Sequence, residues 1–185
     1  MMPELPPLGD PQHYPNEMPS LRESELISKI ENAFRDVVLG NGDSLNMTEY
    51  YDSGGCAPHF KERAANDERY DWTRIADSDI EIFQVVFCFT NLEGFRFYIP
   101  AYMIWSIRNP DSDCFSADAT IYALNPYSHQ FSETSMIEFF SKSQIDAMLS
   151  FLDFWAAHPN FADADARQNA SAIRAHRSEI KKHGG

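Results

Sequence analysis

The residues best suited to metal or nucleophilic chemistry are Cys56 and His59, three positions apart in Cys56-Ala-Pro-His59. A cysteine thiolate and an imidazole nitrogen are common zinc ligands, and the same pair can act as a nucleophile and its base. A zinc site needs three or four converging ligands, and no second C-x-x-C or H-x-x-x-H pair accompanies this one. We therefore expect no metal and no cofactor. A small-molecule-binding or hydrolytic site in the loop around Cys56 and His59 is kept as the alternative function.

Acidic pairs recur along the chain without completing a known site. Three Asp-x-Asp pairs begin at Asp77, Asp111 and Asp163. None of them continues with the glycine and the distant glutamate of a calcium loop, so we interpret them as helix caps and turns. The sequence also contains no G-x-S-x-G elbow and no P-loop. A non-enzymatic function is therefore our first expectation.

Two segments combine aromatic rings with carboxylates, a composition typical of protein interfaces. The predicted partner-binding residues are Tyr50, Tyr51, Asp52, Asp67, Glu68, Tyr70, Asp71 and Trp72. Interface hot spots favour Tyr and Trp, and carboxylates at the rim steer basic partners. For Trp72 a second interpretation stays open, in which the ring fills a small core beneath its loop.

The charge of the chain is strongly negative and unevenly distributed. The formal net charge is −13 and the sequence pI is about 4.7. Residues 163–185 carry a net charge of +2, so the other 162 residues carry ten Lys or Arg against 25 Asp or Glu. Such a chain repels nucleic acid and anionic membranes and attracts basic proteins. We expect a basic protein partner, for example a toxin or a nucleic-acid-acting enzyme, and leave the oligomeric state open.

The hydrophobic patterns predict an α-rich α+β fold with four to five helices and a few short strands. Ser20 and Glu23 form a capping box before a helix over residues 21–38, and Ser141 and Gln144 form another before a helix that extends to Trp155. Thr90 and Glu93 match the same capping-box pattern. A last helix over about 163–182 opens at Asp163. Its apolar residues are mostly alanine, so we expect weak packing or a surface position.

The middle of the chain is less clearly patterned. Residues 80–89 are β-branched and aromatic, which favours a buried strand over a buried helix. Residues 120–124 are a second candidate strand. Residues 57–65 suggest a short helix with Pro58 in its first turn. A helix either begins at Pro100 or is kinked there, and in both cases Trp105 is expected in the core.

Three regions follow from this composition. Residues 1–19 hold six of the eleven prolines and are expected to form a flexible arm, residues 20–158 a single globular domain, and residues 159–185 a basic helix and tail. No apolar run approaches the ~20 residues of a membrane span, and the N-terminus has no signal-peptide pattern. Three widely spaced cysteines argue against a disulfide framework. We expect a cytoplasmic protein.

Residues 92–107 resemble an uncharacterised bacterial family that is known only as a domain of unknown function. The family signature has the form F-R-[FY]-Y-[LI]-P-A-[YF], which is matched here by Phe95, Arg96, Phe97, Tyr98, Ile99, Pro100, Ala101 and Tyr102. The likeness extends over roughly residues 20–157 and leaves out the proline-rich arm and the last helix. It implies a bacterial source and a compact cytoplasmic domain, and it implies no activity.

Acidity, small size and the lack of a catalytic motif together suggest a function. We expect a non-enzymatic, acidic, protein-binding inhibitor, such as an immunity protein against a bacterial toxin or a related defence or counter-defence factor. The terminal Gly184 and Gly185 are expected to be a simple chain end.

Overall fold

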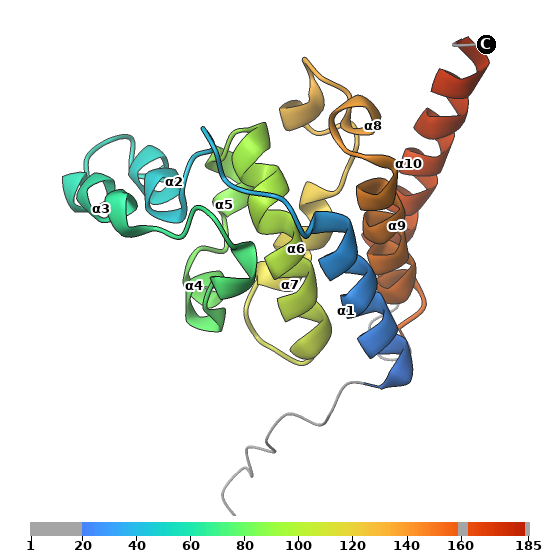
Figure 1. Ribbon diagram of the computed structural model, residues 1–185, viewed down its shortest axis with the longest axis horizontal. Coiled ribbons are helices and arrows are strands. Elements are labelled where there is room, and N and C mark those ends of the chain that lie inside the picture. Colours follow the sequence, from blue (N-terminus) through green and yellow to red (C-terminus); the bar gives the residue numbers. More distant parts are fainter. Residues whose placement is uncertain (1–19, 159–162, 184–185) are drawn as a thin grey trace, which may run out of the picture.

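The computed structural model describes residues 20–158 and 163–183, and every regular element in these ranges is a helix (Figure 1). The α-helices are α1 (Leu21–Phe34), α2 (Leu45–Asp52), α3 (Pro58–Arg63), α4 (Asp77–Ile82), α5 (Val86–Phe89), α6 (Leu92–Arg108), α7 (Ser116–Ala123), α8 (Met136–Phe139), α9 (Lys142–Ala156) and α10 (Ala164–His183). Three 3₁₀ turns, η1 (Ala64–Asn66), η2 (Trp72–Arg74) and η3 (His129–Phe131), lie between them. The expected proline-rich arm falls outside the described residues.

The predicted α+β fold is wrong, because the described residues form no strand and contain more helices than the four to five expected. Residues 80–89 contain the end of α4, a connection over residues 83–85 and the whole of α5, instead of a strand. Their buried side chains are Ile80, Phe83, Val86 and Phe87, at intervals of three, three and one. This spacing fits one side of a helical segment and does not alternate as a half-buried strand does. Tertiary packing therefore overrides the strand propensity of these β-branched and aromatic residues.

The second predicted strand, over residues 120–124, lies mostly in α7. Thr120 is β-branched, but its hydroxyl donates a hydrogen bond to the Ser116 carbonyl one turn earlier, at 2.6 Å. This bond satisfies the buried hydroxyl within the helix. The side chain is fully buried, so packing decides the conformation.

Helix α6 is the centre of the fold, and α1, α9 and α10 lie on one side of it with α2, α3 and α4 on the other (Figure 1). It continues through Pro100, so the longer of the two helices considered is the one formed. The resembling segment supplies its core: Phe95, Phe97, Ile99 and Tyr102 have no measurable exposure. Trp105 is 2% exposed, which confirms its predicted core position. A helix that is apolar on all sides must be surrounded by others.

Gly42 and Gly94 allow the turn at residues 40–43 to pack against the start of α6. The cap of α6 is Asn91, whose side chain accepts the Gly94 N–H at 3.0 Å, and not Thr90 as a capping-box pattern over residues 90–93 would have it. A Cβ atom on Gly94 would lie 1.9 Å from Thr90 Oγ1 and 2.8 Å from the Asp43 carbonyl oxygen. Any side chain at this position would therefore push the turn away from the helix.

The capped helices follow the sequence closely. Two of the three predicted capping boxes form, at Ser20 with Glu23 and at Ser141 with Gln144, and the one predicted at Thr90 with Glu93 does not. Helix α1 ends at Phe34, four residues earlier than predicted, and the chain turns at Gly40, which has a φ of 57°. The short helix predicted after Ala57 is confirmed as α3, with Pro58 at its start.

Helix α10 packs more closely than its alanine content suggested. Asp163 caps it by accepting the Ala166 N–H at 2.7 Å, and Ala166, Ala170 and Ile173 are buried against the core. Asn169 Nδ2 also donates to the Ile121 carbonyl of α7 at 2.8 Å. Small side chains let two helices approach closely, so an alanine-rich face can form a tight contact. No helix in the described ranges has the length and apolar character that a membrane span requires.

Candidate functional site

Cys56 and His59 lie at the surface, in the turn before α3 and in its first turn. The Cys56 thiol is 4.0 Å from the Gly54 carbonyl oxygen, and the His59 ring lies against Phe60 with ring centroids 4.3 Å apart. Cys88 is exposed as well, although its apolar surroundings in the sequence suggested burial, and all three cysteines are free. Among the described residues no group of three or more His, Cys, Asp or Glu side chains could hold a metal ion.

Of the predicted partner-binding residues, Trp72 belongs to the core. Its side chain is 3% exposed, and Nε1 donates a hydrogen bond to the Phe34 carbonyl at the end of α1, at 2.8 Å. This position matches the second interpretation kept open for Trp72, a ring that fills the core beneath its loop. The ring thus holds the loop over residues 67–75 against α1.

Three of the predicted carboxylates accept hydrogen bonds from backbone N–H groups of the protein itself. Asp67 accepts the backbone N–H and the side-chain amide of Asn46 at the start of α2. Glu68 Oε1 accepts the N–H groups of residues 69, 70 and 71 at 2.9–3.1 Å. The hydrogen bond from Tyr70 N–H contributes most to lowering the pKa of Glu68. Asp71 caps η2 through Thr73. These carboxylates therefore stabilise the conformation of the loop over residues 67–75.

The predicted tyrosines differ in exposure. Tyr70 is 81% exposed, and Tyr51 is 41% exposed with its hydroxyl 3.1 Å from Asp43 Oδ1. Partial burial, followed by the nearby Asp43 carboxylate, raises the pKa of Tyr51. Tyr50 is half-buried, beside Gly55 and below the Lys61 ammonium group. Asp52 is exposed at the end of α2. The tyrosines of α2 and Tyr70 therefore remain available to a partner.

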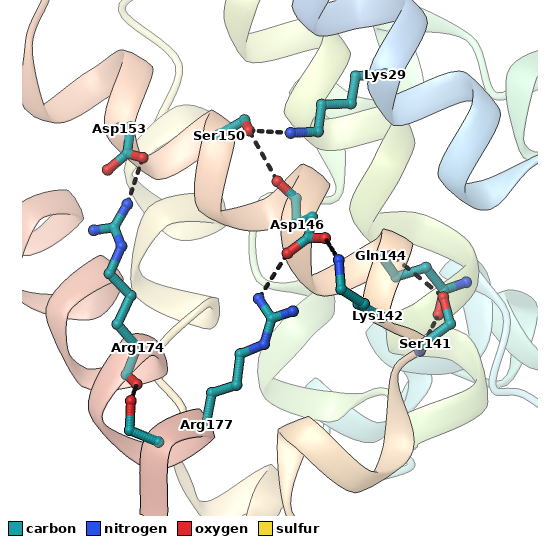
Figure 2. Close-up of polar contacts among 10 residues, drawn as sticks. Lys29, Ser141, Lys142, Gln144, Asp146, Ser150, Asp153, Arg174 and Arg177 are labelled. Atoms are coloured by element: carbon teal, nitrogen blue, oxygen red, sulfur yellow. Dashed lines mark hydrogen bonds and ion pairs between the residues drawn. The ribbon is translucent and has the colours of Figure 1, made fainter. Parts of the chain in front are cut away.

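An open groove of about 570 Å³ lies between α1, α9 and α10, and two carboxylates in its wall, Asp146 and Asp153, form ion pairs (Figure 2). Asp146 binds Lys142 at 2.6 Å and Arg177 at 2.7 Å, and Asp153 binds Arg174 at 2.5 Å. The bonds from Lys142 and then Arg177 lower the pKa of Asp146. The two arginines come from α10 and the two carboxylates from α9, so these charges attach α10 to the rest of the fold.

A different surface combines exposed apolar side chains with unopposed acidic charge, and we call it the acidic-apolar face. Its residues are the exposed Ile82, Val85, Phe115 and Tyr122 together with the exposed carboxylates Glu81, Asp111, Asp113 and Asp118. Exposure is 68% for Ile82, 55% for Phe115 and 69% for Tyr122. Large apolar side chains this exposed, in one region, are typical of an interaction site.

Hydrogen bonds between α4 and the start of α7 bring these residues together. The Phe115 N–H donates to Gln84 Oε1 at 3.3 Å, and the Ser116 hydroxyl donates to the Ile80 carbonyl at 2.7 Å. The Cys114 thiol donates to the Glu81 carbonyl at 3.7 Å. Phe115 and Tyr122 are seven residues apart, nearly two helical turns, so they share one side of α7 about 10 Å apart. Helix α5, which follows Val85, also contacts α7.

The acidic-apolar face draws its charge from two stretches of one sign. Residues 75–95 and 109–141 together contain nine Asp or Glu and no Lys or Arg. Burial, followed by the carboxylates of Asp163 and Asp165, raises the pKa of Asp118, and burial raises the pKa of Asp79 in α4. Both carboxylates are partly buried, and the charged neighbours that raise the pKa of Asp118 are themselves acidic. A cation brought by a partner would stabilise them.

Sequence reasoning missed this surface because it placed residues 80–89 in a buried strand and residues 120–124 in a second strand. The absence of Lys and Arg from 75–95 and 109–141 is the signal that could have identified it. The exposure of Phe115 and Tyr122 carries no such signal, since an aromatic residue in a short helix is usually buried.

The comparisons with known proteins give one match. A family model described as a family of unknown function, DUF6714, matches residues 22–177, and no curated protein and no solved structure matches the chain. The match begins in α1 and continues past residue 157 into α10, so it includes the helix that the resemblance left out. It covers most of the chain, and the protein therefore belongs to the family of unknown function DUF6714.

Proposed function

We propose that this protein binds a basic protein through the acidic-apolar face and inhibits it without catalysis of its own. The observation that carries the proposal is the coincidence of exposed rings, Phe115 and Tyr122, with carboxylates that no lysine or arginine of the same stretches opposes. Aromatic side chains provide binding energy when a partner buries them. The carboxylates around them select partners of positive charge.

The long-range electrostatics favour the same class of partner. A net charge of −13 gives the molecule a negative field that speeds the approach of a cationic protein and slows that of an anionic one. The basic side chains Arg174 and Arg177 are engaged with carboxylates on the far side of α6 from α4 (Figure 1, Figure 2). They therefore do not neutralise the acidic-apolar face.

The partner class that fits best is a toxin or another enzyme that acts on nucleic acid. Such enzymes carry basic surfaces because they bind phosphates, and a dense set of carboxylates can occupy the same surface. On this proposal the chain is an immunity protein or a defence or counter-defence factor. Binding to the basic site of the enzyme would exclude its substrate, so no chemistry by the inhibitor is required.

The proposal is tested by comparing which proteins the full chain and its variants retain from an extract of the native host. The test variant is Phe115→Ser with Tyr122→Ser, and the control is Leu21→Ser, which changes an exposed apolar side chain of α1 outside both predicted surfaces. We expect one basic protein that wild type and control retain and the double variant loses. The purified partner should be inhibited at an equimolar ratio. A partner that is acidic, or one that the double variant retains equally, would contradict the proposal.

A further inference from the structure

A cleft lies where the end of α1 meets α6 and the start of α9, and we call it the Arg96 cleft. Its volume is about 360 Å³, which suits a small molecule. Its charged lining residues are two arginines, Arg35 and Arg96, against one carboxylate, Asp36. The rest of its lining is polar or aliphatic, namely Asn32, Ala33, Val37, Val38 and Gln144. An excess of positive charge in a cleft is unusual for a protein with a net charge of −13.

Arg96 has hydrogen-bonding capacity that the protein does not use. Its side chain is partly buried on α6, and the guanidinium lies over the Phe139 ring, with Cζ 4.7 Å from the ring centroid. Within residues 20–158 and 163–183 it makes no hydrogen bond and no ion pair. A guanidinium has five N–H donors in a planar fork, and here all of them are left to solvent or to a ligand. Stacking on Phe139 orients this fork without occupying its donors.

A second unused donor belongs to Gln144 at the start of α9, a residue that is only 7% exposed. Its Oε1 accepts the Ser141 N–H at 3.0 Å in the capping box, which fixes the amide beside Ser141 (Figure 2). Its Nε2 donates to no described residue, and it is not among the unpaired side-chain atoms that the described part of the chain encloses from solvent. Nε2 therefore remains accessible, and the cavity that Gln144 lines is the Arg96 cleft.

Arg35 adds a second cation, which a neighbouring side chain holds in place. Its Nη2 donates to Asn32 Oδ1, and Asn32 Nδ2 donates in turn to the Ser28 carbonyl of α1 at 2.8 Å. The other donors of Arg35 have no partner in the part of the chain that the structure describes. Asp36 is the opposing charge of the cleft, but neither arginine forms an ion pair with it. Donors of this kind bind an oxyanion most strongly.

We propose that the Arg96 cleft binds a small phosphate monoester. Arg35, Arg96 and Gln144 come from three different segments, so their donors approach a ligand from different directions. A phosphate monoester has three terminal oxygens and can accept from each of them, whereas a carboxylate has only two. The aliphatic side chains of the cleft contact the organic part of the ligand. Binding here is independent of the proposed inhibition, because no residue of the acidic-apolar face lines the cleft.

The test is titration of the isotope-labelled full chain with phenyl phosphate, inorganic phosphate and benzoate, followed by nuclear magnetic resonance at constant ionic strength. We expect both phosphates to shift the amide signals of residues 32–38 and of Arg96 saturably. Affinities should lie in the millimolar range, because the net charge of −13 opposes any anion. Benzoate, which keeps the ring and replaces the phosphate by a carboxylate, should bind at least about tenfold more weakly than phenyl phosphate. If neither phosphate binds saturably, or if benzoate binds as tightly as phenyl phosphate, the proposal is wrong.

Three variants assign the binding to the cleft. Arg96→Gln and Arg35→Gln each remove a cation, and Gln144→Glu keeps the acceptor of the capping box but replaces the donor by a carboxylate. Each should weaken the binding of phenyl phosphate at least about tenfold, as the loss of a hydrogen bond to a charged group does. Arg63→Gln removes an exposed cation of α3 outside the cleft, so it is the matched control and should bind as wild type does. Wild-type affinity in Arg35→Gln or in Gln144→Glu would overturn the proposal even if Arg96→Gln failed to fold.

Discussion

Trp72 and Trp105 are both buried, but only the Nε1 of Trp72 has a hydrogen-bond partner among the described residues, so the same substitution at the two positions gives an informative comparison. Trp72→Phe and Trp105→Phe each replace a buried indole by a phenyl ring, at positions 3% and 2% exposed, so both lose similar packing. Only Trp72→Phe loses a hydrogen bond, the 2.8 Å contact to the Phe34 carbonyl. That carbonyl also accepts the Val37 N–H at 3.1 Å, so it stays partly satisfied. The difference should therefore be the net value of one hydrogen bond, about 1 kcal/mol.

The assay is urea unfolding of both variants beside wild type, followed by far-ultraviolet circular dichroism, with thermal midpoints as a second measure. We expect Trp72→Phe to be the less stable variant by about 1 kcal/mol, which corresponds to a midpoint about 2–4 °C lower for a chain of this length. If Trp105→Phe is equally or more destabilising, its Nε1 has a partner in the free protein. The contrast between a hydrogen-bonded and an unpaired indole would then be wrong.

Three further substitutions test the fold and its charges. Gly94→Ala should lower the thermal midpoint by several degrees, since its Cβ would collide with Thr90 and the Asp43 carbonyl; a wild-type midpoint would show that the turn gives way freely. Ser141→Ala should cost about 1 kcal/mol in urea unfolding because it removes the cap of α9, and a change below measurement error would contradict this. Asp146→Asn should cost about 1 kcal/mol near neutral pH, and the loss should shrink at high salt. Because the folded-state pKa of Asp146 lies below its ordinary 3.8, its contribution is present above that value and disappears as the pH falls through the folded pKa, so wild type and variant should converge in acid.

The helices that carry local signals were predictable, and the contacts between distant segments were not. The starts of α1 and α9 are predicted by capping boxes, at Ser20 with Glu23 and at Ser141 with Gln144, because a capping box satisfies backbone donors within four residues. Residues 80–89 are ambiguous locally, since β-branched and aromatic residues suit any buried surface. Their helical form depends on packing against α6 and α7, for example the Tyr102 hydroxyl that donates to the Phe83 carbonyl at 2.7 Å. Such a contact spans 19 positions and leaves no local pattern.

The candidate site, like the fold, was only partly predictable from the sequence. Composition and charge indicated an acidic protein with aromatic residues at its surface, and these features are read from the sequence alone. Which aromatic residue is exposed depends on tertiary structure: Trp72 has an acidic, polar neighbourhood in the sequence and lies in the core, while Phe115 has a similar neighbourhood and lies 55% exposed. Trp72 packs in the core and donates its Nε1–H to the Phe34 carbonyl, 38 positions earlier in the chain, and no local pattern indicates this contact.

The central claim is that acidic charge and exposed rings on one face bind a basic partner, and the association kinetics of the purified pair test it most directly. In stopped-flow or surface-based measurements, the association rate should fall by about an order of magnitude or more as salt rises towards 1 M, with little change in dissociation. Glu81→Lys with Asp113→Lys should slow association and flatten its salt dependence, whereas Phe115→Ser should mainly speed dissociation. An association rate that responds neither to salt nor to the double charge reversal would contradict the account.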